Sequence, residues 1–426
     1  MDFHLLHPRD QIVRIMDRIY ANRLTTLSGG NLSVRDANGD VWITPAGIDK
    51  GNLSADDIMC IRADGMTSGP HTPSSEFPFH RWIYEKRPDI FAIVHAHPSA
   101  LVSFSIVRIV PDTSVIPQAR SVCGRVGYAP YALPGSEQLG RNIAGTFASG
   151  CNVVLLENHG AVTGGSDLLN AYHRIETLEF CARTIILARR LGGIHTLSGE
   201  QIASFDRRDE GLPEFEPLRH ESRERELRGK IVEVVHRACD RFLMISTEGV
   251  VSARVGGDEF LITPTGVDRR SLGREDIVLV RGGKRERGKR PSRSVRLHEA
   301  IYRMHPGVGS VITAQSPGVA AYAVTSKRFE TRTIPESYIL LRDIPVIPFG
   351  SQYTEPEEIA RNVSETVPVL LIENDCLLTS GGTILEAFDR LEVAESSARS
   401  LIDSLPLGDV VPIGEKEIRD IREKYL

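Results

Sequence analysis

Three histidines in the first half of the chain have the residue type and spacing of metal ligands. His95 and His97 close an apolar run that predicts a strand, and side chains two residues apart on a strand point to the same face. Two imidazoles at that spacing can hold one cation. His159 follows a second apolar run and precedes Gly160, where a strand gives way to a turn. Neutral imidazoles suit Zn²⁺ and similar metals, and three protein ligands leave one coordination position open for a substrate.

A carboxylate and a glycine turn add to the histidines. Glu76 follows two serines and precedes an amphipathic helix, which is also the pattern of an ordinary capped helix start. Asn31 lies in a glycine turn whose backbone N–H groups can bind an anion, although many such turns have no ligand. A His-x-His pair alone is often only a half-exposed strand. The combination of these features is therefore the signal, not any one of them.

The sequence contains one scaffold twice. The segment 40–49 (DVWITPAGID) matches 259–268 (EFLITPTGVD) at an offset of 219 residues (268 − 49). Further matches join HRWIY at His80 to HEAIY at His298, and LLEN at Leu155 to LIEN at Leu371. The offset drifts slowly along the chain, as a few loop deletions would cause. A repeat of this length predicts duplicated domains rather than a solenoid.

The expected organisation is two domains and a linker. We expect a first domain at residues 1–204, a charged linker at residues 205–225 and a second domain at residues 226–426. The linker is dense in charge, contains prolines and lacks apolar periodicity.

Each copy alternates short strands with helices. In the first copy, residues 10–22 and 171–191 have helical patterns, and residues 40–43, 90–97 and 152–157 have strand patterns. This mixture predicts a layered αβα domain of the α/β class.

Composition excludes several classes of protein. The net charge is −5, with 41% hydrophobic and 25% charged residues, which is ordinary for a soluble protein and gives no reason to expect nucleic acid. Six scattered cysteines without a C-x-x-C pair predict buried thiols in a reducing compartment. No signal peptide and no membrane span are predicted, so we expect a cytoplasmic protein. The basic run at residues 281–296 is interpreted as a solvated face, with an anionic ligand or the first domain's acidic surface as alternatives.

Six segments of the first copy together resemble the class II aldolase/adducin family. They occur in the family's order and spacing and are Ser28-Gly-Gly-Asn-Leu-Ser33, Thr44-Pro-Ala-Gly47, Pro73-Ser-Ser-Glu76, His95-Ala-His-Pro98, Tyr128-Ala-Pro-Tyr131 and Glu157-Asn-His-Gly160. The resemblance covers nearly all of the first domain. It implies an αβα fold with a central, largely antiparallel sheet. It also implies Zn²⁺ or another divalent metal, one per chain, on His95, His97 and His159.

The resemblance further implies a reaction. In the family's aldolases the metal holds the carbonyl and hydroxyl oxygens of a ketose phosphate, and it stabilises the enediolate left when the C–C bond breaks. The carboxylate that matches Glu76 moves the proton, and we expect its shielded position beside a metal to tune its pKa toward neutrality. Tyr131 matches a tyrosine that reaches a neighbouring subunit's site as a proton donor.

The resemblance also places the substrate. The residues that match the family's phosphate-binding turns are Gly30, Asn31, Gly47, Ser74 and Ser75. Ala46 stands where these turns usually carry Thr or Ser, so one hydroxyl donor is missing. Lys50, interpreted as a surface lysine, could supply charge instead.

The second copy keeps the framework and loses the chemical positions. In the order Asn31, Glu76, His95, His97, His159 and Tyr131, its residues are Val250, Ser294, Thr313, Gln315, Asp375 and Val346. We therefore expect a second domain without a metal site and with a structural or regulatory role. A second, different activity is the alternative.

The expected function is that of a metal-dependent, class II aldolase-type lyase. Its reaction would be the reversible aldol cleavage of a small ketose phosphate or related sugar acid. Decarboxylation of a 3-oxo sugar-acid phosphate is the enzymatic alternative. The family's 4-epimerases rank lower, because they tend to have aspartate where Glu76 stands. A non-catalytic scaffold or sensor with a vestigial metal site is the other alternative.

The resemblance finally predicts an assembly. Family members of one domain commonly form rings of four, with each site at a subunit boundary. A tandem chain could build such a ring from two copies, so we expect a homodimer forming a pseudo-tetrameric ring. If the domains alternate, each first-domain site borders a second domain, which carries Val346 in place of Tyr131.

Overall fold

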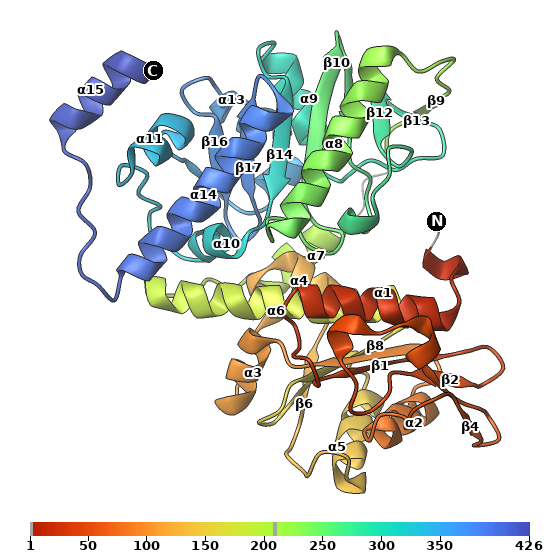
Figure 1. The fold of residues 1–426 in the computed structure, drawn as a ribbon. Helices are drawn as coiled ribbons and strands as arrows, with labels where there is room; N and C mark the ends of the chain where they lie inside the picture. Colours follow the sequence, from red (N-terminus) through yellow and green to blue (C-terminus); the bar gives the residue numbers. More distant parts are fainter. Residues whose placement is uncertain (1–2, 208–210) are drawn as a thin grey trace. The chain divides into compact units, whose positions relative to one another are not determined.

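The computed structural model describes residues 3–207 and 211–426, which form two compact units (Figure 1). One unit comprises the residues up to Thr113 together with Gln118–Arg183, and the other comprises Ser114–Pro117 and Thr184–Leu426. The linker and the domain boundaries expected from the sequence stay a prediction. Residues 208–210 of that linker lie outside the described residues.

The N-terminal half is built around one sheet. From the N-terminus to Leu191 the main elements are α1 (Pro8–Ala21), β1 (Asn31–Arg35), β2 (Val41–Ile43), η2 (Lys50–Asn52), η3 (Ala55–Asp57), β3 (Met59–Ile61), β4 (Thr67–Ser68), α2 (Phe77–Lys86), β5 (Ala92–Ala96), α3 (Ser99–Ile106), α4 (Pro117–Cys123), β6 (Val126–Ala129), α5 (Glu137–Ala148), β7 (Val153–Leu156), β8 (Ala161–Gly165) and α6 (Leu168–Leu191). The strand order is β4-β3-β2-β1-β5-β8-β7-β6. All neighbours are antiparallel except β6 and β7. The expected largely antiparallel sheet is confirmed.

Helices cover both faces of this sheet, as Figure 1 shows. On one face, α2 and α5 pack through Phe79, Ile83 and Ile143 onto Ile93 of β5. On the other face lie α1 and α6. Helix α1 begins with proline at its first position and buries its apolar residues at helical spacing, among them Ile12. The two helices and three strands expected in this half are confirmed as α1, α6, β2, β5 and β7, with their ends shifted by a few residues.

The C-terminal half repeats the arrangement. After Leu191 the elements are α7 (Gly199–Asp206), β9 (Glu214–Phe215), α8 (Ser222–Asp240), β10 (Val250–Gly256), β11 (Glu259–Ile262), η5 (Arg269–Ser271), β12 (Val278–Arg281), β13 (Lys284–Glu286), α9 (Val295–Met304), β14 (Ser310–Ala314), α10 (Pro317–Ala323), α11 (Pro335–Leu341), β15 (Val346–Ile347), α12 (Ser351–Thr354), α13 (Pro356–Asn362), β16 (Val369–Ile372), β17 (Leu377–Gly381), α14 (Ile384–Ser404) and α15 (Glu415–Tyr425). The strand order is β15-β16-β17-β14-β10-β11-β12-β13-β9. Apart from the added strand β9, this is the order of the first sheet.

The two sheets also agree in register. Asn31 of β1 lies opposite His95 of β5. In the second sheet, Val250 of β10 lies opposite Thr313 of β14. Because a one-residue slip would turn every side chain to the other face, equal register means that matching residues in the two copies have matching environments. A comparison of the copies is therefore a comparison of equivalent sites.

The added strand β9 brings acidic residues beside the basic run at residues 281–296. Strand β9 pairs in parallel with β13, which lies inside this run. The Arg285 guanidinium lies 2.7 Å from a carboxylate oxygen of Glu214, and that of Arg287 lies 3.2 Å from Glu216. The basic run thus pairs with acidic residues of its own unit. This corrects the interpretation of the run as only a solvated face.

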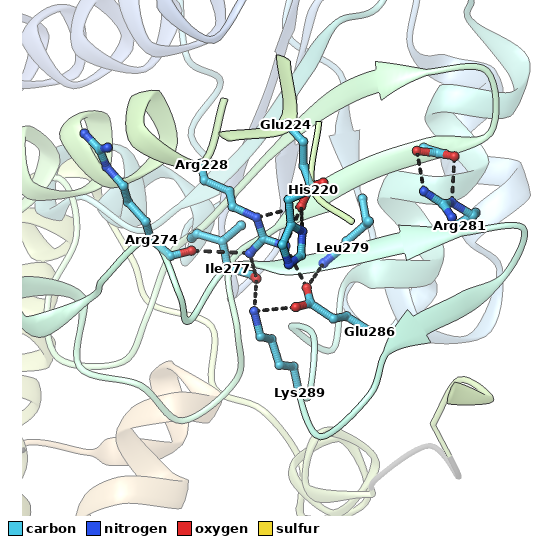
Figure 2. Close-up of polar contacts among 10 residues, drawn as sticks. His220, Glu224, Arg228, Arg274, Ile277, Leu279, Arg281, Glu286 and Lys289 are labelled. Atoms are coloured by element: carbon cyan, nitrogen blue, oxygen red, sulfur yellow. Dashed lines mark hydrogen bonds and ion pairs between the residues drawn. The ribbon is translucent and has the colours of Figure 1, made fainter. Parts of the chain in front are cut away.

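A buried network of ion pairs links α8 to β13 and to the residues that follow this strand (Figure 2). The Arg228 guanidinium donates to Glu224 at 2.8 Å and to Glu286 at 2.7 Å. Glu286 also accepts from Lys289 at 2.7 Å, and Glu224 contacts His220 at 2.8 Å. Removing one member of such a network is strongly destabilising, because it leaves an uncompensated buried charge. The network therefore ties α8 to β13.

Two further expectations concern the whole chain. The six cysteines are all unpaired, and they are buried except for Cys376, which is half-buried. The buried thiols predicted from the sequence are thus confirmed. Among the described helices, none combines the length and the apolarity needed to cross a bilayer.

Candidate metal and acid/base site

The three histidines predicted as ligands converge in the structure. His95 lies near the end of β5, His97 follows that strand, and His159 occupies the turn between β7 and β8. Their candidate ligand atoms all lie within 4.8 Å of one another. The Nε2 atoms of His95 and His97 are 3.1 Å apart. The cluster arises because β5 and β8 are neighbours in the sheet.

A backbone carbonyl orients the ring of His95. Its Nδ1 lies 3.0 Å from the carbonyl oxygen of Ala161. Because a carbonyl can only accept, Nδ1 carries a proton and donates it, so Nε2 faces the cluster and Glu76. This is the support that metal-binding histidines commonly have.

The other two imidazoles are held neutral. Burial, with the neighbouring His95, lowers the pKa of His97 to about 3 and that of His159 to about 4. At neutral pH both rings therefore keep a free lone pair. A metal ligand must be deprotonated, so this environment suits cation binding.

Glu76 lies beside the cluster. Its Oε2 is 3.3 Å from Nε2 of His95 and accepts a 2.8 Å hydrogen bond from Asn31, whereas its Oε1 is 3.9 Å from Nε2 of His159. Among the described residues, the buried Oε1 has no hydrogen-bond partner. Burial alone would raise the pKa of Glu76, but His95, His159 and Asn31 together hold it well below its usual range. These contacts lower the pKa of Glu76 because nearby donors outweigh desolvation, and the shift toward neutrality expected beside a metal stays a prediction.

Behind Glu76 is a polar chain that the sequence analysis missed. Asn31 accepts from Nε2 of the buried His80 at 2.5 Å, and Nδ1 of His80 lies 2.7 Å from the Ser33 hydroxyl. That hydroxyl also contacts the Tyr84 hydroxyl at 2.7 Å. Asn31, expected to bind substrate, thus holds Glu76 in this structure. The signal was present in the repeat, since HRWIY and HEAIY both keep the histidine and tyrosine.

Two glycines let the backbone approach the histidines closely. A Cβ at Gly30, where φ is +72°, would lie 2.6 Å from the His95 carbonyl oxygen. A Cβ at Gly160 would lie 2.6 Å from the Ala96 carbonyl oxygen and from a ring carbon of His97. Neither position can carry a side chain without displacing the site.

The predicted phosphate-binding turns lie together. Pro45, two residues before Gly47, forms an isolated bridge with Pro73, next to Ser74. The Ser74 hydroxyl accepts from the Glu76 backbone N–H at 3.3 Å, and Ser75 is exposed. These turns adjoin the carboxylate, and their substrate-binding role stays a prediction.

Lys50 is not a surface residue. It is 2% exposed and donates to the Pro45 carbonyl oxygen, and burial lowers its pKa to about 8. In the second copy, Arg269 is equally buried and donates to the carbonyl oxygen of Pro264. A buried cation that serves the same turn in both copies supports the backbone, so the interpretation of Lys50 as a surface lysine is wrong.

Tyr131 is not joined to the cluster. Its backbone N–H donates to Glu157 at 3.0 Å, but its side chain is 56% exposed. Within residues 3–207 and 211–426 its phenol makes no hydrogen bond. The structure of one chain therefore brings Glu76 and the histidines together and leaves Tyr131 at the surface.

The equivalent place in the second unit has a hydrogen-bonded cluster, which we call the plug. Its members are Asp375, Gln315, Gln352 and Tyr353. Asp375 accepts from Gln315 at 3.1 Å, from Gln352 at 2.6 Å and from the Tyr353 hydroxyl at 3.1 Å. Burial raises the pKa of Tyr353, so its phenol keeps the proton that it donates. These side chains satisfy one another where the first unit has converging imidazoles.

The second unit also keeps the serine, histidine and tyrosine of the polar chain but lacks the asparagine at its end. Ser252, His298 and Tyr302 repeat the first unit's serine, histidine and tyrosine contacts. Because Val250 replaces the asparagine, the buried Nε2 of His298 has no partner among the described residues. In the part of the chain that the structure describes, the first unit's three histidines are the one group with metal-ligand geometry.

The donor set of the first unit fits a divalent cation of the Zn²⁺ type. Three imidazole nitrogens converge, one ring is oriented by a carbonyl, and two rings are neutral. Imidazole is a good ligand for Zn²⁺, and a site with three protein ligands can accept a substrate atom as a fourth.

Comparison with known proteins identifies the family. The family model of the Class II Aldolase and Adducin N-terminal domain matches residues 10–186 and again residues 229–402. An L-fuculose phosphate aldolase of Methanocaldococcus jannaschii is 34% identical over 181 residues, which are 42% of this chain and 96% of that protein. A 3-oxo-tetronate 4-phosphate decarboxylase of Haemophilus influenzae is 32% identical over 201 residues, 46% of this chain and 91% of that protein. A solved structure of an L-fuculose 1-phosphate aldolase is 33% identical, with a TM-score of 0.43, and covers 46% of this chain and 92% of its own. Because the family model matches both repeats and most of the chain, this protein belongs to the class II aldolase and adducin N-terminal domain family.

Proposed function

We propose that the first unit is a divalent-metal-dependent lyase that cleaves a C–C bond of a small ketose phosphate or related sugar acid in a reversible aldol reaction. The observation that carries the proposal is the position of Glu76. Its carboxylate has one oxygen anchored by Asn31 and one buried, unpaired oxygen, and it faces three converging histidines. A buried carboxylate oxygen without a hydrogen-bond partner is costly in a purely structural role.

The residues that would hold the cation are His95, His97 and His159, one ion per chain. When bound, a cation of this kind polarises a carbonyl oxygen and stabilises negative charge on adjacent oxygens. His95 is fixed for this task by Ala161, and the close approach of Gly30 and Gly160 keeps the site narrow.

Glu76 would move the proton. Aldol cleavage removes a proton from the hydroxyl on one side of the breaking bond and delivers a proton to carbon on the other side. The low pKa of Glu76 means that it is ionised at neutral pH and can accept a proton. Asn31 and, behind it, His80 hold the Glu76 carboxylate in one orientation. The carboxylate therefore does not have to reorient before it takes up the proton.

The substrate class rests on the adjacent turns and on the relatives. Gly30, Gly47, Ser74 and Ser75 belong to turns that adjoin the site, and backbone N–H groups of such turns can bind an anion. Relatives near one third identity are named as aldolases or decarboxylases of sugar phosphates. Ala46 removes one hydroxyl from this region, so a carboxylate is also a candidate anion.

A product assay tests the reaction. The purified protein with Zn²⁺ is offered a panel of ketose phosphates and sugar acids, and aldehyde formation is measured. The reverse reaction is followed with dihydroxyacetone phosphate as donor. We expect an aldehyde from at least one substrate and synthesis in reverse. If no substrate yields an aldehyde although metal is bound, the aldolase proposal is wrong.

The second candidate is decarboxylation of a 3-oxo sugar-acid phosphate. It is favoured by the 32% identity to a 3-oxo-tetronate 4-phosphate decarboxylase. It needs the same charge stabilisation next to a carbonyl, but it releases CO₂ and no aldehyde. The same panel therefore separates the two reactions. A scaffold or sensor would bind metal and give neither product.

For the assembly we propose a homodimer that forms a pseudo-tetrameric ring. In an alternating ring, Tyr131 would lie at the second unit's plugged site, and the first unit's site would adjoin the partner's second unit. The catalytic role expected for Tyr131 then rests on the resemblance alone. Tyr353 and Tyr425 are the candidates to replace it, unless the reaction needs no such donor.

A further inference from the structure

The two units differ at the end of the sheet that lies away from the histidine group. The segment Arg87-Pro88-Asp89 leads into β5, and His305-Pro306-Gly307 leads into β14, an offset of 218 residues (305 − 87). The histidine group and the plug lie at or beyond the carboxyl ends of these strands. Both strands have 5 residues, a length of about 17 Å. The segments before them therefore form a separate place in each unit.

In the first unit a single arginine fills this place. The Arg87 guanidinium donates to both carboxylate oxygens of Asp89, at 2.8 and 2.6 Å. It also donates to the carbonyl oxygens of Phe147 and Cys151, at 3.1 and 3.0 Å, and to the carboxamide oxygen of Asn152 at 2.8 Å. Every N–H group of the guanidinium is thus used. These contacts join the start of β5 to the end of α5 and the start of β7.

The second unit has lost the side chains of this arrangement. In the order Arg87, Asp89 and Asn152, its residues are His305, Gly307 and Pro368. The His305 ring turns elsewhere, since its Nε2 lies 2.7 Å from the carbonyl oxygen of Ala360. A Cβ at Gly307 would meet no atom within 4 Å. The space that matches the Arg87–Asp89 pair is therefore open in the second unit.

This open space belongs to a cavity of about 440 Å³. Its walls come from the segments before β14 and β16, the end of β17 and the first turns of α14. Glu365 and Gly382 are exposed, so the cavity opens to solvent beside them. The volume lies in the range of about 300–1,000 Å³ that is typical of small-molecule sites. The polar side chains of the lining are His305, Ser364, Glu365, Ser380, Glu386 and Arg390.

The cavity has gained carboxylates where the first unit has neutral residues. Glu365 stands at the position of Ser149, and Glu386 at the position of Asn170. Oε2 of Glu386 accepts a 2.8 Å hydrogen bond from the Gly382 N–H, which holds this carboxylate at the wall. The Glu365 carboxylate makes no hydrogen bond or ion pair with the described residues. The second unit has therefore replaced a filled, charge-balanced place with an open and acidic one.

Arg390 is the one arginine or lysine among the described residues of the lining, and it serves the backbone. It donates through Nη1 to the Ser380 carbonyl oxygen and through Nε to that of Leu340, the latter at 3.1 Å. Arg174 makes the equivalent contacts in the first unit, so Arg390 belongs to the repeated scaffold. With one positive and two negative side chains, the lining has a formal net charge of −1 (1 − 2).

We propose that this cavity binds a small organic cation with a guanidinium group, which takes the place that the Arg87 guanidinium has in the first unit. In the bound state its N–H groups donate to the carboxylates of Glu365 and Glu386. A guanidinium is planar and presents its donors as a fork, which matches the two oxygens of a carboxylate. A metal ion fits less well, because among the described residues only the three histidines of the first unit form a group with metal-ligand geometry.

The inference gives a binding role to the unit that lacks the histidine group. It concerns residues of the second unit alone, and it does not rest on the reaction proposed for the first unit.

Isothermal titration calorimetry on the full chain tests the proposal. L-arginine is the probe, and L-citrulline is the matched control compound, because it has nearly the same shape and a neutral urea group in place of the guanidinium. L-arginine is expected to bind with a Kd of about 1 mM or lower. L-citrulline is expected to bind at least about tenfold more weakly, because its hydrogen bonds to the carboxylates lack the cationic charge.

Two variants place the bound cation in the cavity. Glu386→Gln keeps an acceptor for the Gly382 N–H and removes the charge, so the affinity for L-arginine is expected to fall at least about tenfold. The triple variant His305→Arg, Gly307→Asp, Pro368→Asn restores the side chains of the first unit. It is expected to abolish binding, because these side chains fill the space. Glu423→Gln, on an exposed position of α15, is the matched control and is expected to keep the wild-type affinity.

A wild-type chain that does not bind L-arginine would overturn the proposal, and so would equal affinity for L-citrulline. Unchanged affinity for L-arginine in Glu386→Gln would place the cation elsewhere and would overturn it as well. Unchanged affinity in the folded triple variant would have the same meaning. Circular dichroism shows which variants are folded, and Glu386→Gln decides the question if the triple variant is not. Turnover is not a readout, so failure of the proposed reaction leaves these outcomes intact.

Discussion

Oε2 of Glu76 lies 3.3 Å from Nε2 of His95 and accepts a hydrogen bond from Asn31, while Oε1 of the same carboxylate is buried without a partner among the described residues. One oxygen is therefore anchored and the other is available to a proton. This division is what a general base needs, because the anchored oxygen sets the direction in which the available one points.

The first prediction concerns Glu76. Glu76→Gln keeps the shape of the side chain but cannot take up a proton, so kcat is expected to fall at least about 10²-fold. Metal content is expected to stay the same, because the histidines are untouched. Glu85→Gln, on the exposed side of α2, is the matched control and is expected to keep full activity. Near wild-type turnover in Glu76→Gln would return Glu76 to the role of an ordinary helix start.

The second prediction concerns the metal. Elemental analysis of the wild-type protein is expected to find about one Zn²⁺-like ion per chain, because only the first unit has a three-histidine group in the described residues. The double variant His97→Ala, His159→Ala is expected to lose it. His71→Ala, which removes a histidine outside the group, is expected to retain it. A ratio near two ions per chain, or metal retained in the double variant, would contradict the assignment.

The third prediction concerns Tyr131. Because its phenol is exposed and an alternating ring would direct it to the plugged second site, Tyr131→Phe is expected to have a kcat close to that of the wild type. Steady-state kinetics measures this. A loss of about 10²-fold or more would identify Tyr131 as a proton donor. It would then follow that first-unit sites face one another in the assembly.

The fourth prediction concerns acid stability of the second unit. Burial lowers the pKa of His298 to about 3, from a usual value of 6.5. Below pH 6.5 the unfolded chain binds a proton that the folded chain does not bind until about pH 3. The free energy of unfolding is therefore expected to fall as the pH falls through this window, by at most about 1.4 kcal/mol per pH unit for this one group.

Hydrogen exchange of α9 at several pH values measures this effect. His298→Asn removes the titrating group and keeps a donor near Ser252, so its stability is expected to depend less on pH between 6 and 4. A pH dependence equal to that of the wild type would show that His298 is not responsible.

The sequence by itself determined the scaffold and predicted the three histidines that converge in the structure. The drifting offset between DVWITPAGID and EFLITPTGVD predicts two domains of one fold, and the family model matches both. The spacing of His95 and His97 places two imidazoles on one face, because strand alternation is a property of neighbouring residues. Helical and strand periods are local in the same way, which is why α1, β5, β7 and α6 were predictable.

Only the tertiary structure decided what each polar residue contacts. Lys50 is buried, Asn31 holds Glu76, and the contacts of Glu76 lower its pKa. The partners of Asn31 and Glu76 come from segments that are remote in the sequence. Burial and electrostatic environment depend on such remote contacts, and a local pattern carries no information about them.

The same holds for Asn158 and Asn374. In the sequence they are one residue type in one motif, and their backbones have the same conformation. In the tertiary structure Asn374 is buried and its side chain donates to the carbonyl oxygens of Val115 and His195, whereas Asn158 is exposed. Identical local sequence gives identical local geometry, whereas the covering of a surface depends on which distant segment reaches it.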